Sequence, residues 1–213
     1  TEEELAESYQ FHICGCQLQT FFLKLDLDGE ELSNPARTII RQKAEEMFQA
    51  TVLPSCTEGA LFLRNFAGYG LLSYPPGEQD RVRHSLRELL KQLEANKSLF
   101  GKVEFTIGLG RPIQEVRELA GSMNTARLAA AERLIEGRGR MLEDVPPDSS
   151  LPKQAILNRY TKLVDHGIDI IDGDTLRLAR ESLRAGVLAV SRVRGREIFE
   201  LVLDAGKIFS LRA

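Results

Sequence analysis

The sequence predicts an α/β (α+β) protein, with a mixed, antiparallel-containing sheet flanked by helices and followed by a small helical segment. Two observations lead to this prediction. In the first two thirds of the chain, segments with the period-two alternation of strands are interleaved with segments of helical spacing. In the last third, apolar residues recur only at helical spacing.

Three segments are predicted to be single strands. In residues 21–28 one set of alternate positions is wholly apolar, which is typical of a central strand with one buried face. Residues 102–108 follow the same pattern and should form a second such strand. Residues 140–144 are expected to form a short edge strand.

A β-hairpin is predicted for residues 60–75. Two apolar runs flank a middle stretch that contains Gly68 and Gly70, and runs of this length separated by glycine-containing residues are typical of hairpins. The tip is the first place to look for chemistry, because a catalytic signature there would distinguish an enzyme from a module whose hairpin only closes a sheet.

Three helices are expected to cover the sheet. The first spans residues 34–49, with Asn at its N-cap and Pro35 at its first helical position. Proline has no backbone N–H, but an N–H at this position would have no partner within the helix. The second spans residues 79–96, and the third spans about 113–136 with Gly137 as its left-handed C-cap. The expected buried residues are Ala36, Ile39, Ile40, Ala44, Met47 and Phe48, then Val82, Leu86, Leu89, Leu90 and Leu93, then Val116, Leu119, Ala120, Met123, Ala126, Ala130 and Leu134.

Residues 146–152 are rich in proline and serine and are predicted to link a domain of residues 1–145 to a helical segment of residues 153–213. Three helices are predicted in that segment: 153–166, ended by Gly167, then about 174–190 and about 196–211. Their expected buried residues include Leu176, Ala179, Leu183, Val187 and Val190 in the second helix, and Ile198, Val202, Ala205 and Phe209 in the third.

The composition is that of an ordinary globular protein, with 43% hydrophobic and 28% charged residues. A net charge of −3 leaves no electrostatic footprint for nucleic acid. No apolar run approaches the roughly 18 residues of a membrane helix, and the N-terminus lacks the basic start of a signal peptide. We therefore expect a cytoplasmic protein without membrane contact, and the acidic start without methionine favours a fragment of a longer chain.

The cysteine and histidine residues indicate no catalytic site. The chain has an odd number of cysteines, namely Cys14, Cys16 and Cys56, and no Cys-x-x-Cys motif. Free thiols are therefore expected, with a metal or redox site as the alternative. The three histidines lie far apart in the sequence and show no Ser or Cys partner arrangement. No catalytic role is assigned to any of them, namely His12, His84 and His166.

Three polar motifs each allow a functional and a structural interpretation. Asp26 and Asp28 form a D-x-D at a strand end, which could hold Mg²⁺ with a substrate phosphate or could be two solvated acids. Residues 108–112, GLGRP, lack the lysine and the spacing of a phosphate loop, so a turn with positive φ is predicted. A basic triplet is expected in a solvated loop, with contact to DNA phosphates as the alternative: Arg192, Arg194 and Arg196.

The element order, with a D-x-D closing the first strand, resembles the GGDEF (nucleotidyl-cyclase-like) fold of diguanylate cyclases and their catalytically silent relatives. That family reads roughly DLVARYGGDEFAILLP at the hairpin, where this chain reads ALFLRNFAGYGLLSYP, with Arg64 and Pro75 matching. The family's Phe-Lys after the D-x-D is Glu30-Glu31 here. The five signature positions hold Phe66, Ala67, Gly68, Tyr69 and Gly70.

This comparison implies a degenerate domain that keeps the fold without the activity. Both signature glycines, both signature acids and the phosphate-contacting lysine are replaced, so Asp26 and Asp28 would remain as a partial metal site without a third ligand. The resemblance therefore implies no catalytic residue, no bound metal and no cofactor.

A narrower resemblance covers nearly the whole chain. Middle regions of AraC-family response regulators of the YesN type are similar to it in several short motifs, which occur in the same order and at similar spacing. These motifs are residues 9–13 in part, Lys24-Leu25-Asp26, Cys56-Thr57-Glu58, residues 106–111, Ser122 with Ala126 and Ala129, and residues 133–137.

In that family a receiver domain precedes this region and two helix-turn-helix motifs follow it. The resemblance implies a non-enzymatic, dimeric signalling module of a two-component system. A sensor kinase would act through the receiver, and DNA would be contacted only through the helix-turn-helix domain. Two alternatives stay open: a nucleotide- or small-molecule-binding sensor, and a residual nucleotidyl cyclase that uses Asp26 and Asp28 with Mg²⁺.

Overall fold

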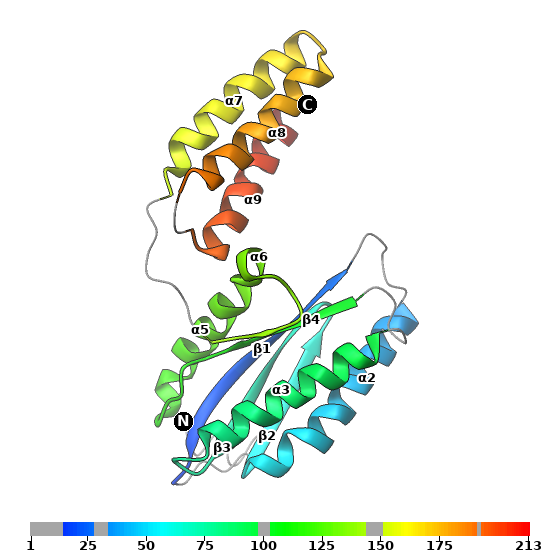
Figure 1. The fold of residues 1–213 in the computed structure, drawn as a ribbon, viewed down its shortest axis with the longest axis vertical. Coiled ribbons are helices and arrows are strands. Elements are labelled where there is room, and N and C mark those ends of the chain that lie inside the picture. Colours follow the sequence, from blue (N-terminus) through cyan, green and yellow to red (C-terminus); the bar gives the residue numbers. More distant parts are fainter. Residues whose placement is uncertain (1–14, 28–33, 98–102, 144–150, 191–192) are drawn as a thin grey trace. The chain divides into compact units, whose positions relative to one another are not determined.

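The computed structural model describes residues 15–27, 34–97, 103–143, 151–190 and 193–213 (Figure 1). The chain divides into two compact units, residues 1–145 and 146–213. Each unit has its own hydrophobic core. None of the described helices is both long enough and apolar enough to cross a membrane.

The first unit is built on a mixed five-stranded sheet within the described residues, with strand order β2-β3-β1-β4-β5. β1 pairs antiparallel with both β3 and β4, whereas β4 and β5 are parallel. The predicted fold class is thereby confirmed. The elements are β1 (Gln17–Leu27), α2 (Asn34–Thr51), η1 (Leu53–Ser55), β2 (Glu58–Arg64), β3 (Ala67–Tyr74), α3 (Gln79–Ala95), β4 (Val103–Leu109), η2 (Val116–Glu118), α5 (Leu119–Ala131), α6 (Arg133–Glu136) and β5 (Met141–Leu142).

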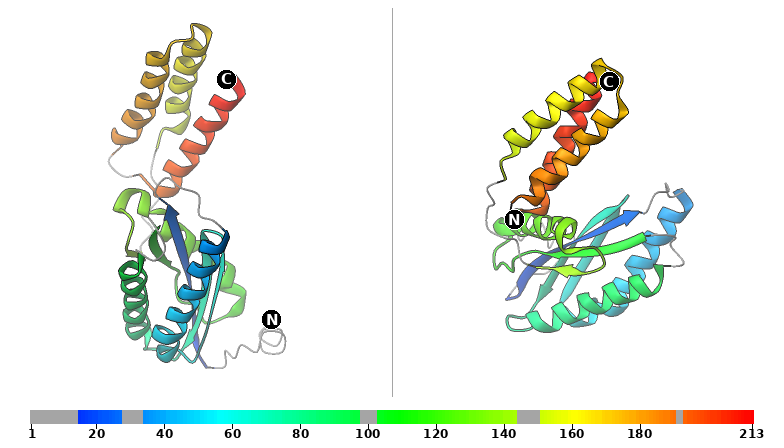
Figure 2. Two further views of the ribbon diagram at one scale, coloured as in Figure 1. Left: turned by 90° about the vertical axis from the view of Figure 1, so that its right-hand side faces the viewer. Right: turned by 45° about the horizontal axis from the view of Figure 1, so that its top comes forward.

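Helices α2 and α3 lie side by side on one face of the sheet, and α5 covers the other face (Figures 1 and 2). Phe21, Leu23 and Leu25 project from β1 into the core beneath α2 and α3, as period-two alternation requires. The predicted buried face of α3 is confirmed at all five positions. In α2 the prediction is wrong at Ile39, which is 51% exposed because the helix turns Ile40, Ala44 and Phe48 inward instead.

Two glycines let α5 lie unusually close to β4. A Cβ on Gly108 would lie 2.1 Å from the carbonyl oxygen of Ala126, and a Cβ on Gly110 would lie 2.4 Å from that of Ser122. Neither glycine has a positive φ. The prediction that residues 108–112 form a positive-φ turn is therefore wrong, since Gly108 lies within β4 and serves helix packing.

The prediction of a single helix over residues 113–136 is also wrong. Ile113 exchanges two backbone hydrogen bonds of 2.8 Å with Leu18, which hold it in an extended conformation. The helical residues begin later and are split between η2, α5 and α6. Gly137 does have a positive φ of 91°, but its ψ of 161° is not that of a left-handed cap, and Leu134 is exposed.

The second unit contains, in its described part, the helices α7 (Lys153–Asp169), α8 (Gly173–Leu188) and α9 (Gly195–Arg212). Gly167, which was expected to end the first of them, lies inside α7, where Leu176 of α8 packs against it. Asp172 starts α8 by accepting backbone N–H groups of Asp174 and Thr175. The buried cluster comprises Ile156, Leu157, Tyr160, Val164, Ala179, Leu201 and Ala205.

Two residues of α9 contradict the predicted core face. Val202 and Phe209 were expected to be buried, but they are exposed. Helix α9 has apolar residues around more than half of its circumference, and the side with Leu201, Ala205 and Ile208 faces the core. An apolar arc this wide can be oriented in more than one way, and the sequence pattern alone did not choose the correct one.

Candidate functional site

The hairpin tip is a two-residue turn made of Asn65 and Phe66. Arg64 pairs with Ala67 across the hairpin, so the glycines expected at the tip lie inside β3 instead. Asn65 has φ 55°, a left-handed conformation that asparagine tolerates better than most residues. Gly70 is needed for packing, since a Cβ there would lie 1.9 Å from the ring of Phe21.

The turn is fastened to the rest of the unit through Phe66. Its carbonyl oxygen accepts the backbone N–H of Leu25 at 2.9 Å, and its ring packs against the core. The guanidinium of Arg37, from the first turn of α2, lies over that ring at 5.0 Å from the centroid. Neither turn residue carries a carboxylate, so the tip offers no acidic ligand for a metal ion.

Asp26, the described half of the D-x-D motif, is held in an ion pair with Arg133 of α6. Arg133 donates from Nε to Oδ2 at 2.7 Å and from its Nη2 to Oδ1 at 3.2 Å. The two side chains are only 14% and 15% exposed. Both carboxylate oxygens are therefore engaged by a cation of the protein itself, and a metal ion would have to displace it.

Lys24 lies two residues before Asp26 on the same face of β1 and adds to this charge cluster. Burial lowers the pKa of Lys24, and nearby Arg133 acts in the same direction, whereas Asp26 opposes both. Asp28 lies outside the described residues. Within the described part, no group of three or more His, Cys, Asp and Glu residues is placed to hold a metal ion.

A cavity of about 340 Å³ lies between the first half of α2 and the tip of the hairpin. Its described lining consists of basic, apolar and small polar residues, with no acidic residue among them. Sequence reasoning missed it, although arginines one helical turn apart in α2 were a visible signal. The lining residues are Leu25, Arg37, Thr38, Ile40, Arg41, Phe62, Leu63, Arg64 and Asn65.

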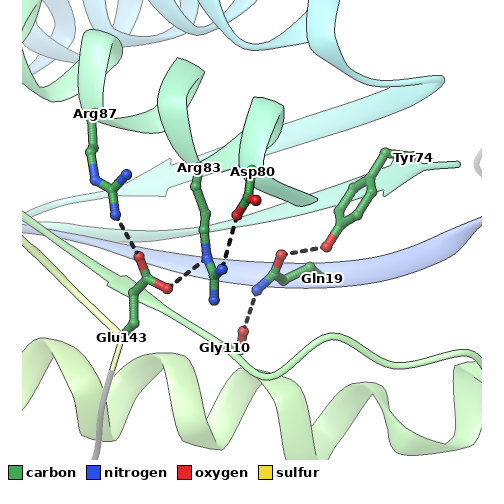
Figure 3. A network of polar contacts seen from close by, with 7 residues as sticks. All are labelled: Gln19, Tyr74, Asp80, Arg83, Arg87, Gly110 and Glu143. Carbon is green, nitrogen blue, oxygen red and sulfur yellow. Dashed lines mark hydrogen bonds and ion pairs between the residues drawn. The ribbon is translucent and has the colours of Figure 1, made fainter. Parts of the chain in front are cut away.

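A second polar network joins β1, β3, α3 and the residue after β5 (Figure 3). The buried Gln19 accepts a hydrogen bond from Tyr74 at 2.5 Å and donates one to the carbonyl oxygen of Gly110 at 2.7 Å. Beside it, Glu143 forms ion pairs with Arg83 at 2.7 Å and with Arg87. These contacts fasten the last described residue of the first unit to α3.

Tyr74 provides a pH test of this network. Burial raises the pKa of its phenol to about 12, although nearby Arg83 acts in the opposite direction. The unfolded chain ionises near pH 10, so the stability that neutral Tyr74 contributes should be present below pH 10 and lost toward pH 12. Ultraviolet titration of tyrosinate should show a late step that Tyr74→Phe removes. If Tyr74→Phe instead removed a step near pH 10, the burial of the Tyr74 phenol would be contradicted.

The other candidate residues from the sequence lie apart. Burial raises the pKa of the Cys56 thiol to about 11, so this cysteine is not an activated nucleophile at neutral pH. His84 lies on α3 and His166 on α7, in different units. Arg196 pairs with Glu200 within α9. Three candidates fall outside the described residues, namely His12, Cys14 and Arg192.

Comparison with known proteins adds no assignment: the sequence matches no family model and no curated protein.

Proposed function

We propose that this chain is a non-catalytic signalling module of a two-component transcriptional regulator, of the AraC-family, YesN type. In this proposal a degenerate GGDEF-like unit and a helical unit couple a receiver domain to a helix-turn-helix domain, both outside this chain. The observation that carries the proposal is the ion pair of Asp26 with Arg133. The element order and the hairpin adjacent to β1 are consistent with it.

The ion pair supports a non-catalytic role because nucleotidyl transfer needs carboxylates that are free to hold metal ions beside the substrate phosphates. Asp26 is already neutralised by a guanidinium, and the hairpin turn contributes Asn65 and Phe66 in place of acids. Among the described residues at the end of β1, these side chains therefore stabilise the unit and provide no free carboxylate for a metal ion.

A homodimer is part of the proposal, and α9 offers the surface for it. The exposed side of α9 carries an apolar stripe at three-and-four spacing, the pattern by which helices pair. Gly206 lies in the stripe, and a Cβ there would meet nothing within 4 Å. A second copy of α9 is the partner that fits this stripe. Its residues are Phe199, Val202, Leu203, Gly206 and Phe209.

We expect Val202→Glu to weaken dimerisation by roughly 100-fold or more, because it would bury an unpaired carboxylate in an apolar contact. Sedimentation equilibrium of the 213-residue chain measures this. Leu211→Glu is the matched control, since Leu211 is exposed on α9 outside the stripe. Equal dissociation constants for the two variants, or a natural chain that is monomeric at high concentration, would refute the dimer through α9.

The signalling role is tested in the full-length regulator. Phosphorylation of the receiver should bias the pairing of the subunits, and this segment should pass that bias to the helix-turn-helix pair. Val202→Glu should leave receiver phosphorylation intact and abolish the increase in DNA affinity that follows it. An unchanged increase would count against a coupling role.

The absence of catalysis is tested by incubating the chain with GTP and Mg²⁺ and assaying for cyclic dinucleotide. None should form. In calorimetry, saturable heat that requires Mg²⁺ and is lost in Asp26→Ala would favour the metal-dependent cyclase instead.

A further inference from the structure

The cavity beside the hairpin tip is lined by three arginines from two elements. Arg37 and Arg41 lie one turn apart on α2, and Arg64 is the last residue of β2. Among the described residues, none of the three forms an ion pair. Three arginines around one cavity make its electrostatic potential positive, which favours a bound anion.

Arg37 is held ready for such a ligand. Its guanidinium lies over the ring of Phe66, and this contact restricts where the group can move. Its Nε is buried and has no hydrogen-bond partner among the described residues. A cation–π contact does not use the N–H donors of the guanidinium, so they can still bind an acceptor. A buried donor of this kind is costly to leave unpaired.

The remaining walls indicate what else the ligand carries. Leu25, Ile40 and Leu63 are apolar and buried, and Phe62 is 70% exposed at the cavity although it is a large aromatic side chain. Thr38 and Asn65 add neutral polar groups. The volume of about 340 Å³ is within the range of small-molecule sites.

From this arrangement we propose that the cavity binds a small anion, a phosphate- or carboxylate-bearing molecule with an apolar part, through Arg37, Arg41 and Arg64 and without a metal ion. Phosphate and carboxylate groups each present two oxygen atoms that can accept parallel hydrogen bonds from one guanidinium. Binding at this cavity would give the module a chemical input in addition to the receiver. The site does not depend on the signalling role, which could fail while the anion still binds.

The test is calorimetry of the natural 213-residue chain in low-salt buffer freed of metal ions by chelating resin, using inorganic pyrophosphate and citrate as separate probes. Saturable binding of either probe is expected, and the better of the two identifies the preferred anion. Arg41→Gln with Arg64→Gln should weaken binding by roughly tenfold or more per arginine, because each loses a charge-assisted hydrogen bond. Both arginines are exposed, so the fold should survive.

The matched control is Arg177→Gln with Arg184→Gln on α8, which removes the same charge from two exposed arginines in the other unit. It should bind like the natural chain. Equal losses in the two double variants, no saturable heat with either probe, or binding that requires Mg²⁺ would each overturn the proposal.

One further variant tests whether acidic residues of the chain itself occupy the cavity. Asp28, Glu30 and Glu31 lie between β1 and α2 in the sequence. If anions bind only after these three are changed to Asn, Gln and Gln, an internal carboxylate is the occupant and the proposal is overturned. Binding that is already present in the natural chain supports it.

Discussion

Replacing Gly108 by alanine is expected to destabilise the first unit by about 3 kcal/mol or more. The added Cβ would lie 2.1 Å from the carbonyl oxygen of Ala126 and 2.4 Å from the backbone nitrogen of Ala130. Both contacts are with helix backbone, which cannot rotate away as a side chain does. Helix α5 would have to move off β4, and the 2.9 Å hydrogen bond between Thr20 and Ser122 would lengthen.

Urea unfolding followed by circular dichroism measures this loss, and hydrogen exchange of the β4 amides assigns it to the first unit. Gly173→Ala is the matched control, because a Cβ at Gly173 would meet nothing within 4 Å and its φ is not positive. The control should change stability by less than about 1 kcal/mol. If Gly108→Ala had an equally small effect, the close packing of α5 on β4 would be refuted.

Gly108 also illustrates how far the sequence predicts this fold. The strand around it was predicted from alternation, because period and burial are local properties of a segment. The structural role of Gly108 was not predicted, because a glycine that permits close packing cannot be distinguished in the sequence from one that permits a turn. The same limit applies to Gly70, which makes room for Phe21 rather than shaping the hairpin tip.

The candidate site shows the same division between local and long-range information. Asp26 was identified from its position at a strand end, but its partner Arg133 is 107 residues away in the sequence. No local pattern relates the two. The hairpin was predicted correctly, whereas its turn was misplaced because cross-strand register, and not glycine content, decided which residues turn.

The arginine cavity could have been found in part. Arg37 and Arg41 are four residues apart on a helix that was predicted correctly, so their common face was implied. Arg64 comes from another element, and only the packing of α2 beside the hairpin brings it near them. A site assembled from two elements requires the fold before it can be seen.

Arg133→Ala is the second change with a large expected effect, a loss of about 2 to 3 kcal/mol in the free energy of unfolding. The variant would leave the carboxylate of Asp26 largely buried with its main cation removed. Lys24 lies nearby on β1 and would compensate only in part, because its own burial disfavours its charge. The loss is measured by the same urea unfolding.

Arg138→Ala is the control for that experiment. Arg138 also pairs with a strand acid, Glu104, but this pair is longer at 3.4 Å and its side chains are 42% and 39% exposed. Solvent screens such a pair, so the loss should be less than about 1 kcal/mol. Similar losses in the two variants would show that the Asp26–Arg133 pair contributes no more to stability than an exposed ion pair does.

The double variant Asp26→Leu with Arg133→Met separates a structural role from a catalytic one. It replaces the ion pair by apolar side chains of similar size, and such replacements of buried pairs are often neutral or stabilising. Most of the stability lost in Arg133→Ala should therefore return. If the chain belongs to the regulator proposed above, the double variant should keep the phosphorylation-dependent gain in DNA affinity, because that proposal gives the Asp26 carboxylate no chemical role. A variant that regains stability but not signalling would mean that the Asp26 carboxylate itself is used in the function.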